Sequence, residues 1–117
     1  MRIVNREAFL AMPAGTVFCK YEPCVFGNLE IKGESTVNAQ GEHIDYWSQD
    51  LAGALKAENS GDYFEAIEAA EAGQSVAMDF DCQSRDGLYE QDQLFAVWEP
   101  HDVLGLIRRL HQANLGA

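Results

Sequence analysis

Five carboxylates near an expected turn are potential ligands of a metal ion. They are Asp79, Asp81, Asp86, Glu90 and Asp92. Hard cations bind several carboxylate oxygens, so this group has the chemistry of a calcium or magnesium site. The calcium-loop spacing fails, however, because Gln83 and Arg85 stand where acidic ligands are needed. We therefore expect a solvated acidic surface with turn-forming aspartates, no functional metal and no cofactor.

Three cysteines and three histidines could provide a zinc site, or a nucleophile with its base. The gap between Cys19 and Cys24 is not the short spacing of zinc sites, and Cys82 with the dispersed histidines completes no set. Cys82 also lies in an acidic stretch, which would raise the pKa of its thiol and oppose nucleophilic reactivity. Cys24, with His43 or His101 as base, is the better nucleophile candidate. No residue pattern places these groups together.

Motifs of the common enzyme classes are absent from the sequence. It contains no G-x-S-x-G, no glycine-rich phosphate-binding loop and no H-x-E with C-x-x-C. We therefore expect a protein that is not an enzyme. A small enzyme with an unrecognised site is kept as a further alternative.

Lone bases and aromatic residues indicate a different kind of site, one that binds a small anionic ligand. Tyr46 and Trp47 are adjacent on an expected strand, so one of the two rings should leave the core. An outward tryptophan is a good anchor, although both rings could instead pack in cores or at an oligomer seam. Bases that we expect outside the core could hold a phosphate against such a ring. The candidate ligand-binding residues are Lys20, Tyr21, Lys32, Trp47 and Arg85.

The formal net charge of −11 lies in one stretch of the chain. Residues 58–102 hold twelve carboxylates and a single base, Arg85, whereas the remaining residues hold seven acids and seven bases. Such a chain is not expected to bind nucleic acid or a membrane directly, but it can attract a basic protein. The candidate partner-binding residues are Glu65, Glu68, Asp79, Asp81 and Asp86.

Periodicity and capping residues predict the elements that position these side chains. We expect strands over residues 16–21, 29–32, 43–49, 75–81 and 93–98, the last of them central, and helices over 6–12, 51–57, 63–72 and from 100 onward. Asn5 should cap the first helix, while Asp62 and Gly73 should bound the third. Pro100 should begin the last helix, with Arg108 and Arg109 in its final turn. The buried stripe of that helix should be Val103, Ile107 and Leu110.

This order of elements predicts an α+β domain spanning residues 1–117. We expect one compact domain, with a mainly antiparallel sheet of about five strands and two or three helices packed on it. The open edges of such a sheet favour a homo-oligomer, most simply a dimer. An odd number of cysteines, without a signal peptide or a membrane-spanning run, favours the reducing cytosol.

Several segments give the chain the look of a known group of proteins. They are Glu7-Ala8-Phe9-Leu10, Pro13-Ala14-Gly15-Thr16, Lys20-Tyr21-Glu22-Pro23-Cys24, Gly27-Asn28-Leu29-Glu30-Ile31-Lys32-Gly33, Asp79-Phe80-Asp81-Cys82 and Gln93-Leu94-Phe95-Ala96-Val97. In them the chain resembles small proteins of bacteriophages and prophages. The resemblance implies an antagonist of host defence acting in the host cytosol. Some such proteins bind protein machines, as anti-CRISPR proteins do, sometimes by mimicking DNA; others are sponges for nucleotide immune signals. No motif of a sponge family is matched, so no site is carried over.

Two hypotheses of function follow. In the first, which we take as the leading one, an oligomeric binder sequesters a small nucleotide-derived signal through the ligand-binding residues above. In the second, an acidic inhibitor blocks a basic, nucleic-acid-binding surface of a host protein. The scarcity of bases weighs against the first, and the spread of the acids over several elements weighs against the second. Bases gathered in a concave pocket would favour the first, and acids aligned on a convex face would favour the second.

Overall fold

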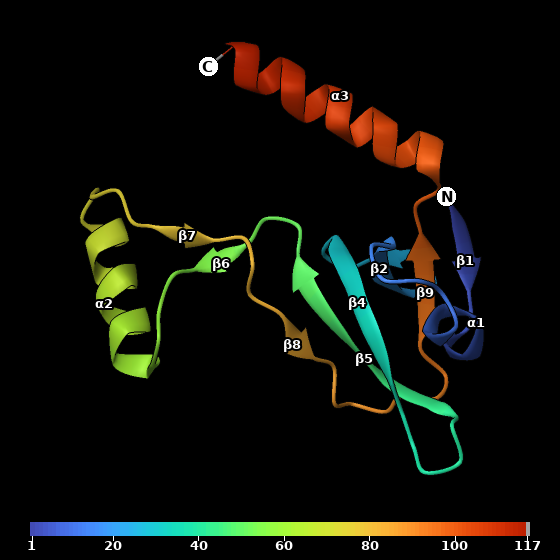
Figure 1. Ribbon diagram of the computed structural model, residues 1–117. Coiled ribbons are helices and arrows are strands. Elements are labelled where there is room, and N and C mark those ends of the chain that lie inside the picture. The colour runs from blue at the N-terminus through green and yellow to red at the C-terminus, as the bar shows by residue number, and fades with distance from the viewer. Residues whose placement is uncertain (117) are drawn as a thin grey trace.

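The computed structural model describes residues 1–116 and has the predicted α+β fold (Figure 1). The elements, in chain order, are β1 (Arg2–Val4), α1 (Arg6–Leu10), β2 (Val17–Glu22), β3 (Val25–Phe26), β4 (Glu30–Val37), β5 (His43–Asp50), β6 (Ala54–Leu55), α2 (Ser60–Glu71), β7 (Met78–Asp79), β8 (Ser84–Arg85), β9 (Leu94–Val97) and α3 (Pro100–Gly116).

The main sheet is antiparallel throughout its described pairings. Its strands lie in the order β1-β9-β2-β4-β5-β8, and β3 pairs with β2. The predicted central position of the last strand is confirmed, because β9 lies between β1 and β2. The sheet has more strands than the five expected, since strands of only two or three residues leave no periodicity in a sequence.

The hydrophobic core lies between α1 and the sheet. Phe9 of α1 is fully buried, and its ring stacks on Phe95 of β9 with centroids 4.0 Å apart. Phe18 of β2 and Tyr46 of β5 complete the aromatic cluster, at 4.6 and 5.0 Å from the Phe9 ring. Four aromatic side chains on four elements therefore fix α1 against the sheet.

Capping residues determine where the shorter helices begin and end. The side chain of Asn5 accepts a hydrogen bond from the Ala8 N–H, which confirms the predicted start of α1. α2 begins earlier than predicted because its cap is Asn59, which accepts from the N–H of Asp62 itself. Gly73, with a φ of +86°, ends this helix as predicted.

The predicted helix over residues 51–57 is wrong. Gly53 has a φ of +79° and donates its N–H to the Asp50 carbonyl, so the chain turns here. The two-residue strand β6 follows and pairs with β7, which is much shorter than the predicted strand over 75–81. Residues 54–81, comprising β6, α2, β7 and the next two residues, are called the acidic arm below.

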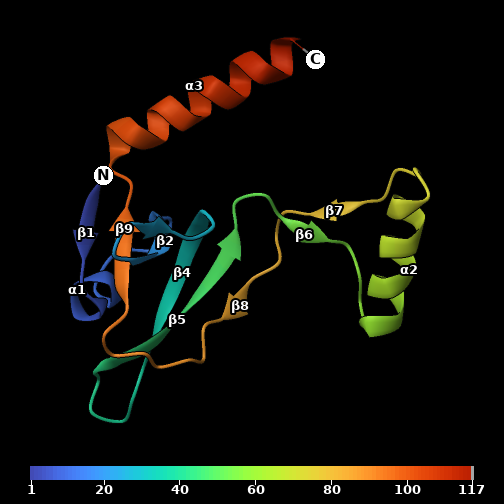
Figure 2. The same cartoon turned by 180° about the vertical axis from the view of Figure 1, so that it is seen from behind.

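Only α1 packs on the sheet; α2 and α3 project from it, and neither contains a buried residue (Figures 1 and 2). α2 lies at the far end of the acidic arm, and α3 leaves the opposite side of the molecule. The expected burial of Val103, Ile107 and Leu110 therefore does not occur within one chain. Arg108 and Arg109 lie in the middle of α3, not in its last turn, because the helix continues to Gly116.

These projections make the chain less compact than predicted. Its radius of gyration is 16.5 Å, whereas a compact domain of this length has about 13 Å. The sheet and α1 form the body of the molecule, and the acidic arm and α3 are extensions of that body.

Candidate functional site

Lys20 and Arg85, two of the predicted ligand-binding bases, line one shallow cavity of about 330 Å³. The same cavity is lined by the carboxyl groups of Glu30, Asp50 and Asp86. Burial is the main cause that raises the pKa of Glu30 above its usual range. Acidic groups thus outnumber the bases here, and the cavity offers no excess positive charge to a phosphate.

Both bases already have carboxylate partners. Lys20 Nζ lies 2.7 Å from Asp86 Oδ1, and Arg85 Nε lies 3.2 Å from Asp45 Oδ2. Arg6 of α1 is only 4% exposed, and its guanidinium lies 3.9 Å from each of the two aspartates. The five residues form an ionic network that joins α1, β2, β5 and β8, in which Arg6 and the two aspartates are buried while Lys20 and Arg85 reach the surface.

Sequence reasoning missed two members of this network, Arg6 and Asp45. Asp45 shares a face of β5 with the exposed Trp47, yet it is fully buried. The reason is the turn after β8, where the N–H of Gly87 donates to both Asp45 oxygens at 3.2 and 3.0 Å. The alternation of side chains along β5 cannot show that Asp45 is covered by a turn 42 residues later in the chain. Three bases share two aspartates in this network, and each base has at least one carboxylate within 4.0 Å, so we interpret the network as structural.

Lys32 lies in the core, and the expectation that all candidate bases lie outside it is wrong. Its side chain is 2% exposed, and its Nζ donates to the Gly33 carbonyl at 3.0 Å. The same Nζ lies 5.8 Å from the centroid of the Phe9 ring, within cation–π range. Burial lowers the pKa of Lys32. Lys32 pairs with Ser48 of β5, on the same face of the sheet as the buried Tyr46, and α1 covers this face with Phe9. Alternation within residues 29–32 cannot show that a helix from elsewhere in the chain covers Lys32.

The aromatic candidates lie apart from each other. Trp47 is 40% exposed while Tyr46 is buried, so the prediction that one ring leaves the core is confirmed. Trp47 pairs with Arg85 across β5 and β8. Tyr21 instead closes the hairpin of β2 and β3, where its hydroxyl accepts from the Cys24 N–H at 3.1 Å. The five predicted ligand-binding residues therefore do not share one pocket.

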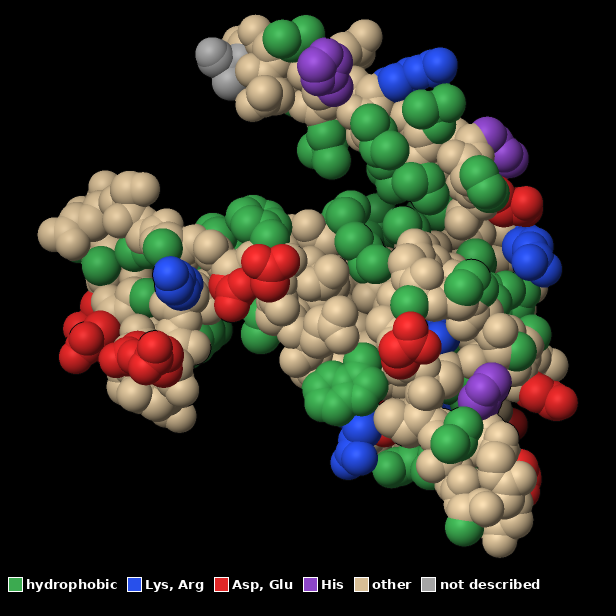
Figure 3. All heavy atoms as spheres, in the orientation of Figure 1, with side chains coloured by type: hydrophobic (Ala, Val, Ile, Leu, Met, Phe, Trp, Pro, Cys, Tyr) green, Lys and Arg blue, Asp and Glu red, His purple; other side chains and the backbone are tan. Residues whose placement is uncertain are grey.

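The acidic arm holds four of the five predicted partner-binding residues. Glu65 and Glu68 lie on α2, Asp79 on β7, and Asp81 follows two residues later. Asp86 is in a different place, because it belongs to the ionic network described above. Figure 3 shows acidic side chains gathered at the end of the molecule that α2 occupies.

The arm concentrates the charge of the molecule. It holds seven carboxylates and one base, Lys56, which amounts to a net charge of −6 out of −11. In the part of the chain that the structure describes, none of these seven carboxylates forms an ion pair. Their field is therefore not cancelled by neighbouring side chains.

Large apolar side chains accompany these acids on the arm. Phe64 is 62% exposed on α2, and three further large side chains of the arm are exposed: Tyr63, Met78 and Phe80. Soluble proteins expose single apolar side chains routinely, but aromatic residues and methionine gathered on one small element are typical of protein interfaces. The arm combines unpaired acidic charge with apolar anchors.

Cysteines, metals and membranes add little to this site. Cys24 and Cys82 are exposed, and Cys19 is buried, which raises the pKa of its thiol. Among the described residues, no hydrogen bond joins Cys24 to a histidine, and no group of three or more His, Cys, Asp or Glu side chains could hold a metal ion. In residues 1–116, no helix has both the length and the apolar character needed to cross a bilayer.

A scan against protein-family models and searches of curated proteins and of solved structures gave no match to this chain.

Proposed function

We propose that the protein is a non-enzymatic binding protein whose acidic arm docks on a basic surface of a partner protein. The observation that carries this proposal is the separation of charge: more than half of the net negative charge lies on one projecting element with no internal ion pairs. An acidic element held away from the body can approach a basic groove without steric interference from the sheet.

The side chains of the arm can both attract a basic partner protein and form buried contacts with it. Unpaired carboxylates steer the approach of a basic partner and raise the rate of association. Aromatic side chains such as Phe64 then supply the buried contacts that dominate the free energy of most interfaces. In the phage setting that the resemblance implies, the partner would be a host protein with a nucleic-acid-binding surface, and the arm would compete with that nucleic acid.

Sequestration of a nucleotide signal stays a prediction, and its support is weaker. In its favour, Lys20 and Arg85 do line one cavity. Against it, each base is paired with an aspartate, and Lys32 lies in the core. A nucleotide would have to displace those aspartates before its phosphates met a free base.

Competition with DNA tests the proposed function. The immobilised chain would first be used to retain a DNA-binding protein from a bacterial lysate, and the chain would then displace a fluorescent duplex from that purified protein. Reversing two charges on α2, with Glu65→Lys and Glu68→Lys, should weaken displacement at least tenfold, about 1.4 kcal/mol, because like charges would then face each other.

A matched control separates the arm from overall charge. Glu22→Lys with Glu42→Lys changes the net charge by the same amount at two exposed positions in the body, and it should leave displacement within about twofold. Equal losses in both double variants would contradict a role for the arm. Retention of nucleotides with no protein bound would favour the sequestration hypothesis instead.

A further inference from the structure

α3 is a helix whose apolar side is not covered by its own chain. Leu104, Ile107 and Leu110 are each about half exposed or more, although they share one side of the helix with Val103. An isolated helix of this length is marginally stable in water, and most helices gain their stability by packing an apolar face. The structure thus shows a helix that lacks the contact its sequence is patterned for.

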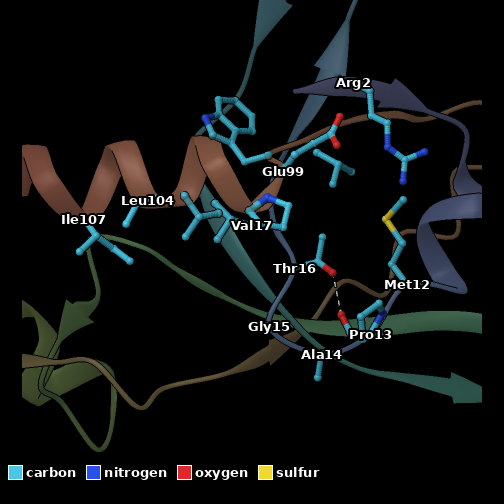
Figure 4. Close-up of a pocket in the computed structure, with 14 residues that line it drawn as sticks. Arg2, Met12, Pro13, Ala14, Gly15, Thr16, Val17, Glu99, Leu104 and Ile107 are labelled. Carbon is cyan, nitrogen blue, oxygen red and sulfur yellow. Dashed lines mark hydrogen bonds between the residues drawn. The ribbon is translucent and has the colours of Figure 1, made fainter.

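A groove lies beside this face of α3. One cavity, of about 710 Å³, is bounded by the start of α3 and by the body, where Met12, Pro13 and Val17 contribute its wall (Figure 4). Leu104 and Ile107 approach it from the helix. A second cavity, of about 490 Å³, lies further along, between Leu110 of α3 and the turn that precedes the acidic arm. Figure 3 shows hydrophobic side chains along the helix and the body on both sides of this hollow.

The exposed area matches what a stable dimer needs. The chain exposes 8180 Å², whereas a compact monomer of its mass exposes about 6,350 Å². The excess is about 1,800 Å², roughly twice the 800 Å² that each partner buries in an interface of standard size. Both projections contribute to this excess, and an interface of standard size through α3 would use about half of it.

The charges at α3 and at the groove are compatible with a second copy of the chain as the occupant. α3 carries two arginines and one aspartate, a net charge of +1, while the rest of the chain sums to −12. Arg108 and Arg109 lie away from the apolar side of the helix, so they would face outward when that side is covered. The groove beside α3 is lined mainly by apolar residues, with Arg2 and Glu99 as its charged residues, so the apolar side of a second α3 meets no excess charge of either sign there.

We propose that α3 is a dimerisation element, which docks with its apolar side in the groove beside α3 of a second copy. A twofold axis makes the exchange reciprocal, so each copy supplies one helix and one groove. This inference concerns a different surface from the acidic arm and does not depend on the proposed partner.

Sedimentation equilibrium at 5 to 100 µM tests the proposal. The wild-type chain should give twice its 13.0 kDa mass at the upper end of this range. The double variant Ile107→Asp with Leu110→Asp should give the mass of one chain throughout, because two charges would then enter an apolar groove. In the control, Gln112→Asp introduces a charge on the opposite side of the same helix and should leave the dimer intact.

A second measurement covers the case in which the double variant fails to fold. In the wild-type chain, hydrogen exchange of the α3 amides should slow at least tenfold between 1 and 100 µM, while exchange in β9 stays unchanged. A wild-type chain of single mass at 100 µM would overturn the proposal, whether the groove is then empty or serves another partner. A dimer that survives the double substitution would also overturn it, since the sheet edges would then be the contact.

Discussion

Replacing Phe9 by alanine should remove a large part of the stability of the fold, because the core is small and Phe9 lies at its centre. The ring contacts three other aromatic rings and lies beneath the Lys32 ammonium group. Truncating a buried phenylalanine costs about 3–5 kcal/mol, and lost aromatic and cation–π contacts place this case near the upper limit. The free energy of unfolding of a domain this size is about 5–15 kcal/mol.

The matched control is Phe64→Ala, the same change on α2. Its side chain is mostly exposed, so the cost should stay within about 0.5 kcal/mol. Urea unfolding followed by tryptophan fluorescence and far-ultraviolet circular dichroism, at one low protein concentration, measures both. With a urea dependence of about 2 kcal/mol per molar, Phe9→Ala should lower the midpoint by about 2 M.

The pair of variants also separates stability from function. Phe64→Ala should weaken displacement of DNA from a basic partner while leaving the urea midpoint unchanged, since we propose that Phe64 anchors the acidic arm on that partner. A loss of more than about 2 kcal/mol in Phe64→Ala would show that the arm belongs to the core after all. A loss below about 1 kcal/mol in Phe9→Ala would show that α1 does not hold the sheet.

Three further predictions follow from single features of the structure. Gly53→Ala should lower stability by about 1–2 kcal/mol in urea unfolding and detach the arm in hydrogen exchange, because φ is +79° and a Cβ atom would lie 2.8 Å from a carbonyl oxygen of β7. Glu30→Gln should raise the urea midpoint at pH 7. Burial raises the pKa of the Glu30 carboxyl in the folded chain above the value of 4.5 in the unfolded chain, so the charged carboxylate lowers the stability of the folded state at pH 7. This loss of stability should disappear as the pH falls to 4, where the carboxyl is protonated. A thiol reagent should modify Cys24 and Cys82 within minutes in the native protein and Cys19 only after addition of urea, because Cys19 is buried and its thiol pKa is raised; three fast thiols would contradict this burial.

Local signals in the sequence were sufficient to predict much of the secondary structure. Asn5, Gly73 and Pro100 correctly mark ends of helices, because caps act through hydrogen bonds a few residues apart. The apolar run of β9 correctly predicts its central position. The α+β class with an antiparallel sheet follows from the order of the elements alone.

Long-range packing is what the sequence could not show. Periodicity predicts a buried stripe on α3, but it cannot say whether the cover comes from the same chain or another. The sequence pattern predicts that Lys32 and Asp45 lie on the surface, yet α1 covers the first and the turn after β8 covers the second. The sequence shows the negative charge of the acidic arm. It does not show that the arm projects from the body, because β6 and β7 have two residues each and leave no periodic pattern.

The acidic arm should open locally more often than the sheet unfolds. It supplies no side chain to the buried cluster, so it can open without disturbing the sheet. The amides of α2 should then exchange through a local unfolding event whose rate hardly depends on urea, while those of β9 wait for global unfolding. A protease should nick the arm first and leave a folded remainder. If the arm docks on a partner as proposed, protection of the arm from cleavage would report directly on that binding.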